Sequence, residues 1–248
     1  MTRYITCHFY FVLFVIYIMK KIIGILGGMG PAATADMFQK FIHLTPATKD
    51  QEHIPLLISS IPDIPDRGTA ILKGGESPLP AMQDYVNRLV QAGAKAILIA
   101  CNTAHYWHKD LQTNCPVPII SMIETAANAA QATGLNNIGI LATSATLSTG
   151  LYKKEIESRG LNYIEPDADS QAKVVESIYM LKAGHFEQAR KLMQAQKEAL
   201  FAKGAQAIIL GCTEVPILLA QEALANPEQY IDATEVLVKR AIAWYFAN

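Results

Sequence analysis

The sequence lacks any surplus of charge. Its 248 residues include 21 Lys and Arg against 22 Asp and Glu, which gives a formal net charge of −1, and the basic residues do not gather into a run. A balance of this kind provides no general attraction to nucleic acid or to an anionic membrane surface. We therefore expect neither a nucleic acid nor a membrane as a partner.

Cysteine is scarce as well. The chain has four cysteines, Cys7, Cys101, Cys115 and Cys212. So few cysteines in a chain of this length do not indicate a disulfide framework, and they are typical of a reducing compartment with thiol chemistry. The sequence thus predicts a cytoplasmic protein, in which Cys115, just before Pro116, has a structural role.

The apolar block Phe9–Ile18 is too short to cross a bilayer, because its ten residues compare with the roughly 20 that a span needs. Only Arg3 provides a positive charge before it, and no small-residue cleavage site follows, so a secretory signal also fits poorly. We interpret residues 1–18 as an over-extended assignment of the gene start, with Met19 as the true first residue. The alternatives are a membrane anchor or an extra strand. A chain that starts at Met19 is expected to be as stable and soluble as the full chain.

The stretch that organises the rest is Ala94–Trp107. Its apolar run turns polar abruptly after Cys101, which is typical of a strand buried on both faces in a parallel sheet. A helical-looking run follows, so Cys101 is expected at a strand-to-helix junction that favours a thiolate. The same order of strand, cysteine, threonine and helix returns in Ala205–Leu218, where Cys212 lies 212 − 101 = 111 positions after Cys101.

Two further echoes have similar spacings, within a unit of roughly 111–115 residues. The strand predicted at Ile22–Leu26 matches Asn137–Ala142, with Gly24 and Gly139 lying 139 − 24 = 115 positions apart. Tyr230–Asp232 echoes Pro118–Ser121 near the end of each unit.

These echoes indicate a duplicated unit of alternating strands and helices. They predict an α/β fold with two pseudo-symmetric, doubly wound parallel sheets. The first domain is expected at 19–120 and the second at 121–225, with a C-terminal helix within 226–248 returning to the first domain. Because ligands of such sheets bind beyond the carboxyl ends of the strands, an active site is expected between the domains, where both cysteines fall.

Two segments between these strands carry specific expectations. The segment Ile61–Pro80 is rich in Pro, Asp and Gly and is predicted as a long loop with a function. The segment Leu147–Arg159 is predicted as one helix.

Two cysteines from related halves suggest a pair of thiols that face one another. A thiol with its pKa tuned toward neutrality can act as a general acid and base, removing a proton from one face of a carbon and returning one to the other. The alternative is that Cys101 and Cys212 are only small buried residues, a common fate of free cysteine.

Three stretches carry a resemblance to a known family: Gly27–Thr34, Ala100–His105 and Gly211–Glu214. On these residues the chain, from about Met19 to its end, resembles the aspartate/glutamate racemases, which act without pyridoxal phosphate. It is most similar to their aspartate racemase branch. The glutamate racemases of cell-wall type carry Asp-Ser-Gly where this chain has Gly28–Gly30 and His where it has Glu214.

The resemblance implies two α/β domains with the active site between them, and Cys101 and Cys212 as the catalytic acid and base. It implies an amino-acid substrate, aspartate in the first place, and no metal, nucleotide or pyridoxal cofactor. A homodimer is compatible with it. A glutamate-preferring or broad-specificity racemase is the first alternative, and a binding paralogue without turnover is the second.

A dicarboxylic amino acid needs cationic partners for its carboxylates. By the resemblance, Arg67 and Lys182 provide them, although each is also a typical surface charge. The remaining candidates for substrate binding are Met29, Gly30, Asn102, Thr103, Thr143, Thr146, Thr213 and Glu214. Hydroxyl and amide groups among them could donate to the carboxylate in the transition state or cap helices.

The role of Glu214 stays open, because a carboxylate two residues from Cys212 should raise the pKa of that thiol. It could receive the substrate ammonium or point away. Two rival sites are weaker: a nucleotide-binding turn at Gly24–Gly30, whose spacing is not the dinucleotide fingerprint, and a zinc site at Cys101, His105 and His108.

Overall fold

The computed structural model describes residues 21–247. The segment 1–18, for which an over-extended start was predicted, lies outside the described residues. Within 21–247, no helix combines the length and the apolar character that a membrane span requires.

The described chain forms two four-stranded sheets in which every pair of neighbouring strands is parallel. The first sheet contains β1 (Ile22–Gly27), β2 (Leu56–Ser60), β3 (Ala94–Ile99) and β4 (Ile119–Ile120), and the second β5 (Asn137–Leu141), β6 (Asn162–Ile164), β7 (Ala207–Leu210) and β8 (Tyr230–Asp232). Their orders, β2-β1-β3-β4 and β6-β5-β7-β8, are the same arrangement repeated. The predicted α/β fold with two pseudo-symmetric parallel sheets is confirmed.

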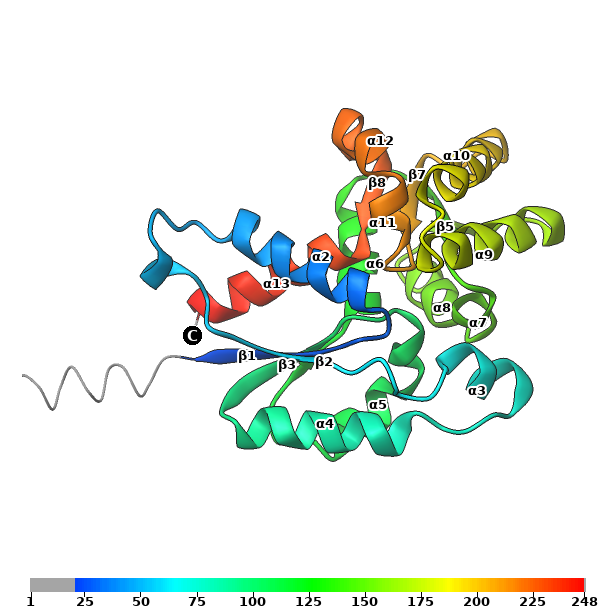
Figure 1. The fold of residues 1–248 in the computed structure, drawn as a ribbon. Helices are drawn as coiled ribbons and strands as arrows, with labels where there is room; N and C mark the ends of the chain where they lie inside the picture. Colours follow the sequence, from blue (N-terminus) through cyan, green and yellow to red (C-terminus); the bar gives the residue numbers. More distant parts are fainter. Residues whose placement is uncertain (1–20, 248) are drawn as a thin grey trace, which may run out of the picture.

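Helices cover both faces of each sheet. They are α2 (Pro31–Leu44), α3 (Arg67–Lys73), α4 (Leu79–Gln91), α5 (His108–Thr113), α6 (Met122–Ala132), α7 (Ser144–Ser148), α8 (Leu151–Glu157), α9 (Ala168–Lys182), α10 (Phe186–Ala202), α11 (Val215–Leu218), α12 (Ala220–Ala225) and α13 (Ala233–Ala247), with the 3-10 turns η1 (Asp50–Glu52), η2 (Thr103–Trp107) and η3 (Pro227–Gln229). Figure 1 shows α2 and α13 on one side of the first sheet and α4 on the other.

Alternating side chains of each strand supply two cores, because successive residues of a strand point to opposite faces. Ile97 and Ile99 of β3 pack with α4, whereas Leu98 packs in the core that contains α2 and α13. The core that contains Leu98, α2 and α13 continues into the second half, where it includes Ile140 of β5 and Tyr152 of α8. One apolar core therefore joins the two sheets.

The last helix connects the halves. From β8, at the edge of the second sheet, α13 runs back to pack on α2 and α6. Its end lies beside the start of β1 (Figure 1), where the Lys21 ammonium donates to the carbonyl of Tyr245 at 3.4 Å and lies 5.3 Å from the ring centre of Trp244.

The echo of Gly24 and Gly139 has a packing cause. A Cβ on Gly24 would lie 2.7 Å from Ile97 and 3.3 Å from Leu89 of α4. A Cβ on Gly139 would lie 3.0 Å from Ala205 and 3.5 Å from Leu200 of α10. In both halves the tightest of these contacts comes from the neighbouring strand or the segment that leads into it, so glycine in the first strand leaves room for the side chains packed over it.

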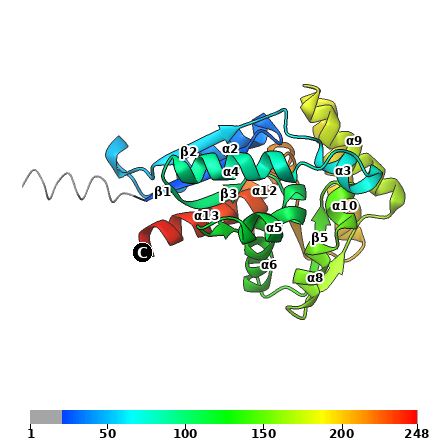
Figure 2. The ribbon, with the colours of Figure 1, turned by 90° about the horizontal axis from the view of Figure 1, so that it is seen from below.

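The structure corrects three local predictions. The predicted loop Ile61–Pro80 contains the helix α3, whose N-terminus is capped by Asp66 and which ends at Gly74 with φ 64°. The single helix predicted over Leu147–Arg159 is two helices, because Gly150 at φ 66° interrupts it. After Cys101 the chain forms the 3-10 turn η2 before a helix begins. Figure 2 shows α3 reaching toward the second half, where it contacts α7.

Candidate active site

A cavity of about 140 Å³ lies between the halves, beyond the carboxyl ends of the strands. Most of the residues predicted for the site line it: Met29, Arg67, Cys101, Asn102, Thr103, Thr143, Lys182, Cys212, Thr213 and Glu214. Gly30 and Thr146 do not belong to the lining, although both contact residues that do. The structure thus brings the predicted residues of the two halves together around one space.

The two cysteines occupy equivalent positions. β3 ends at Ile99 and β7 at Leu210, and each cysteine is the second residue beyond. Cys101 is 6% exposed and Cys212 is 7% exposed, and both thiols are free. A thiol placed this way is shielded from bulk water but faces the cavity.

Cys212 donates a hydrogen bond to a carboxylate. Its Sγ lies 2.9 Å from Oε2 of Glu214, whose other oxygen lies 3.4 Å from the ammonium of Lys182. Burial raises the pKa of the Cys212 thiol, the charge of Glu214 raises that pKa further, and Lys182 lowers it only in part. The prediction that a strand-to-helix junction favours a thiolate is therefore wrong for Cys212, because the following helix α11 has four residues and the nearest charge is negative.

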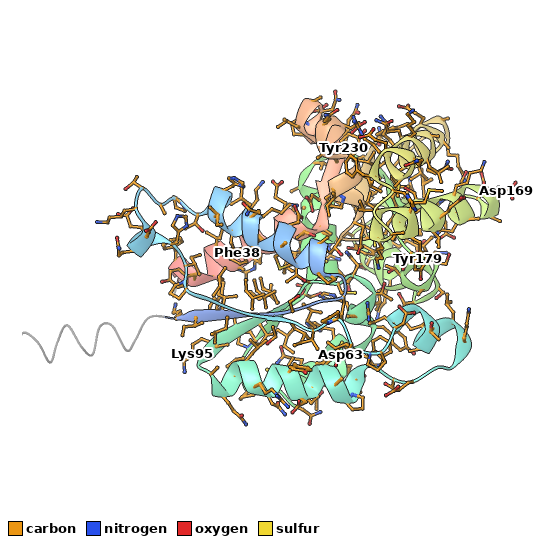
Figure 3. The ribbon with its side chains drawn as sticks, in the orientation of Figure 1. Phe38, Asp63, Lys95, Asp169, Tyr179 and Tyr230 are labelled. Atoms are coloured by element: carbon orange, nitrogen blue, oxygen red, sulfur yellow. The ribbon has the colours of Figure 1, made fainter. Side chains whose placement is uncertain are left out.

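Lys182 is held at the end of α9. Burial opposes the charge of its ammonium, but Glu214 and the two cysteines outweigh this effect and raise its pKa. The ammonium also lies 5.8 Å from the ring centre of Tyr179, which Figure 3 shows on α9. Lys182 thus stays charged at the cavity, with one side toward Glu214.

Three threonine hydroxyls join the halves. The Oγ1 of Thr103 lies 2.8 Å from that of Thr146 and 3.2 Å from that of Thr143, and the last two lie 3.0 Å apart. Thr103 follows β3 of the first half, whereas Thr143 and Thr146 belong to the turn after β5 of the second. Since the Thr143 hydroxyl also accepts the backbone N–H of Thr146, it caps α7 as well, so capping and a place in the cavity lining coexist.

The pseudo-symmetric counterpart of Thr103 is Glu214, two residues after Cys212. Glu214 approaches the turn after β1, where a Cβ on Gly30 would lie 3.4 Å from its Oε1. Each half therefore extends a polar side chain from its cysteine segment to the first turn of the other half. The two contacts between the halves differ in their chemical groups. The contact at Thr103 consists of hydroxyls, whereas the contact at Glu214 contains a carboxylate that is paired with Lys182.

Arg67 is anchored by backbone carbonyls. Its guanidinium donates to Ile64 and Pro65 at 3.1 Å and to Met29 at 3.2 Å. Its Nε is buried, and no hydrogen-bond partner for it exists among residues 21–247. Arg67 is therefore positioned at the cavity wall with no carboxylate of the described chain bound to it, and one N–H donor is unused.

Asn102 is the second cavity residue with an unused donor. Its side-chain oxygen accepts the hydroxyl of Tyr152 at 2.5 Å, while its Nδ2 is buried and has no partner in the described part of the chain. Two of the residues that line the cavity, Asn102 and Arg67, thus each have a buried N–H donor without a partner in the described chain. Unused buried donors are costly, and an anionic ligand would satisfy them.

The two rival sites are not supported by the geometry. The backbone N–H of Met122 donates to Nε2 of His105 at 3.0 Å, and Nδ1 lies 2.8 Å from the carbonyl of Cys101. Burial, aided by the neighbouring His108, lowers the pKa of His105 to about 3. Both ring nitrogens of this neutral histidine are thus occupied by backbone groups, which leaves none for zinc.

The glycine turn is likewise closed to a phosphate. The N–H of Gly28 donates to the hydroxyl of Thr34 at 2.8 Å. A Cβ on Gly28 would lie 2.1 Å from the backbone nitrogen of Ile61, so the turn packs against protein and presents no free cradle.

Sequence reasoning missed some of the residues that line or support the cavity. They are Asp66, Thr69 and Leu72 on the α3 segment, Val175, Ile178 and Tyr179 on α9, and Tyr152 behind Asn102. Figure 3 shows Tyr179 nearer the middle of the molecule than Asp169, which lies at the outer end of the same helix. The amphipathic pattern of α9 could have placed Ile178, but no local pattern points to Tyr152.

The protein consists of two matching α/β halves, and each half contributes one thiol to the same cavity. This arrangement is typical of an enzyme. Comparison with known proteins identifies the family. Residues 26–241 match the family model described as Asp/Glu/Hydantoin racemase. The chain belongs to this racemase family, and racemases are isomerases.

Three relatives illustrate its range. The aspartate racemase of Picrophilus torridus is a solved structure with a TM-score of 0.82 and 31% identity, covering 91% of this chain and 94% of that one. The broad specificity amino-acid racemase RacX of Bacillus subtilis is 27% identical over 230 residues, 91% of this chain and 98% of its own length. The glutamate racemase of Limosilactobacillus reuteri is 29% identical over 159 residues, 62% of this chain and 58% of its own length.

Proposed function

We propose that the protein interconverts L- and D-aspartate by proton transfer between Cα and two cysteine thiols, without a cofactor. The observation that carries this proposal is the pair Cys101 and Cys212, which occupy equivalent positions of the two halves and line the same cavity. A binding paralogue would need neither thiol. The three described cysteines are all free, which supports the expectation of a reducing compartment such as the cytoplasm.

In this mechanism one cysteine, as a thiolate, removes the proton from Cα, and the other, as a thiol, delivers its proton to the opposite face. After one turnover the protonation states of the two thiols are exchanged, so the product enantiomer is the substrate of the reverse reaction. The intermediate carbanion spreads its charge into the α-carboxylate. Hydrogen-bond donors and cations fixed around that carboxylate lower the barrier.

The charges at the cavity favour a dicarboxylic substrate. Arg67, Lys73 and Lys182 line it against Asp66 and Glu214, three cations against two carboxylates. With the one cysteine that acts as a thiolate, these charges sum to zero, so the cavity has no excess of negative charge to repel an aspartate zwitterion, and the unused N–H of Arg67 can bind one carboxylate. Glutamate is the second candidate, because a methylene changes discrimination by only about 1–3 kcal/mol and the relatives include glutamate and broad-specificity racemases.

Assays on a panel of L-amino acids test this assignment. We expect aspartate to be racemised fastest, glutamate more slowly, and alanine and serine far more slowly than either, because a monocarboxylic substrate leaves one cation unpaired. Formation of the D-enantiomer, measured by chiral chromatography, gives kcat/KM for each substrate. Equal turnover of alanine and aspartate would refute the diacid assignment, and no turnover of any member would refute the racemase itself.

The pH dependence is expected to report on Glu214. The carboxylate of Glu214 raises the pKa of Cys212. When Cys212 acts as the base, the rate rises as this thiol ionises, so a raised pKa moves that rise to higher pH. In Glu214→Gln the negative charge is lost and Lys182 acts on the thiol alone, so the rise is expected at lower pH. The profile of kcat/KM for each enantiomer measures it.

For that experiment the pH-dependent rate of Cys212 alkylation gives an independent reading. Glu124→Gln, a change at an exposed position of α6, is the matched control and should leave the profile in place. A Glu214→Gln profile that coincides with the wild type would show that the carboxylate does not govern the thiol.

A further inference from the structure

The contact between Tyr152 and Asn102 links a buried helix of the second half to the cavity wall of the first. Tyr152 belongs to α8 and is 1% exposed, and Asn102 follows Cys101 and is 2% exposed. The tyrosine hydroxyl donates to the amide oxygen of Asn102 at 2.5 Å. Fifty positions separate the two residues in sequence, so only the docking of the halves creates this bond.

The bond selects one orientation of the Asn102 amide. Burial raises the pKa of the Tyr152 hydroxyl, which therefore keeps its proton and needs an acceptor. The amide oxygen of Asn102 is that acceptor. With the oxygen fixed, the two N–H bonds of Nδ2 must point elsewhere, and they find no partner in residues 21–247. Asn102 is one of the residues that line the cavity, so a ligand bound there is the partner that we assign to Nδ2.

We propose that Tyr152 is a positioning residue that, by holding the oxygen of Asn102, directs the Nδ2 donor toward the substrate carboxylate on which charge builds when Cα loses its proton. The inference rests on the proposed function for the identity of that carboxylate. A fixed donor of this kind acts mainly in the transition state, because it needs no reorientation when the charge appears. Tyr152 itself touches no reacting atom, and its effect passes through Asn102.

A double-mutant cycle tests the coupling. Asn102→Ala removes the donor and is expected to lower kcat for L-aspartate by about 100-fold, the usual effect of losing one such donor. Tyr152→Phe removes only the hydroxyl and is expected to lower kcat by about tenfold and to weaken ground-state binding by a smaller factor, since the amide can then turn. The double variant is expected to match Asn102→Ala alone, because without the amide the hydroxyl has nothing to position.

Two more variants separate positioning from general stability. Asn102→Asp keeps an oxygen for Tyr152 but presents an acceptor to the carboxylate, so the folded variant should lose activity as strongly as Asn102→Ala, at some cost in stability for the buried carboxylate. Tyr163→Phe removes a hydroxyl whose partner is Glu165 at 3.4 Å, outside the cavity lining, and should leave kcat unchanged. Thermal unfolding of each variant provides the stability reading.

Binding of succinate, a four-carbon dicarboxylate that cannot be racemised, gives a reading independent of turnover. Titration calorimetry should show weaker binding to Tyr152→Phe and to Asn102→Ala, and no further loss in the double variant. If this coupling holds while no amino acid is racemised, the positioning stands and the proposed function fails. If aspartate is racemised but the two losses multiply, or Tyr152→Phe keeps the wild-type kcat, the positioning is refuted and the function stands.

Discussion

Cys101→Ser and Cys212→Ser are each expected to reduce racemisation of aspartate by about 10²–10⁴-fold, the range that general acid–base catalysis contributes. A serine hydroxyl is a far weaker acid than a thiol, so it can neither give up its proton at neutral pH nor return one as readily. Each substitution disables one face of Cα. The remaining thiol can still exchange the proton of the enantiomer that it faces, so we expect exchange of opposite enantiomers in the two variants.

Cys115→Ser is the matched control for this experiment. Cys115 is also free and buried, at 7% exposure, and it packs in the apolar core of the first half away from the cavity lining. The substitution should affect thermal stability about as the others do and leave racemisation intact. Full activity in Cys101→Ser or in Cys212→Ser would end the two-thiol account, whatever their stability.

The second large loss of activity on aspartate is expected when either cavity cation, Arg67 or Lys182, is replaced by alanine. Arg67→Ala removes a guanidinium of the cavity lining that donates to the carbonyl of Met29 and whose buried Nε has no partner in the described chain. Lys182→Ala removes the partner of Glu214 and with it the opposing charge that keeps the Cys212 pKa from rising further. A buried carboxylate without its cation costs several kcal/mol, so activity on aspartate should fall by roughly 100-fold or more in each variant.

Comparison of substrates shows whether the loss concerns the carboxylates. Activity on aspartate should fall much more than the residual activity on alanine, because only aspartate has a second carboxylate to lose its partner. Arg88→Ala and Lys153→Ala, at side chains that are 64% and 58% exposed, are the matched controls and should change neither. If Arg67→Ala and Lys182→Ala both keep the wild-type activity on aspartate, the diacid assignment loses its basis, even if the two thiols act as proposed.

The parts of the fold that could be predicted are those with a local or periodic cause. The strand before Cys101 is buried on both faces, so its apolar run marks it in the sequence, and the same is true before Cys212. Gly24 and Gly139 repeat because in both halves side chains of the neighbouring strand segment pack closely over the first strand. Equivalent strand ends then place both cysteines at one cavity by topology alone.

The parts that could not be predicted depend on contacts between distant segments. The ion pair between Lys182 and Glu214 joins α9 to the segment after β7 within the second half, 32 positions away in sequence (214 − 182), and the bond between Tyr152 and Asn102 arises only when the two halves dock. Glu214 could be predicted to raise the pKa of Cys212 but not to pair with Lys182. The helix α3 was missed because it is short and lies among loop-forming residues, where capping by Asp66 decides its start.

The most direct test of the central claim, proton transfer by two separate thiols, is racemisation of L-aspartate in deuterium oxide with both enantiomers followed by mass spectrometry from the first turnovers. In the first turnovers, before the thiol that receives the Cα proton has exchanged it with solvent, that thiol returns the same proton, whereas the opposite thiol delivers deuterium from solvent. The account predicts D-aspartate carrying deuterium at Cα while the remaining L-aspartate keeps its proton. Early D-aspartate that retains the original proton, or equal early labelling of both enantiomers, would contradict it.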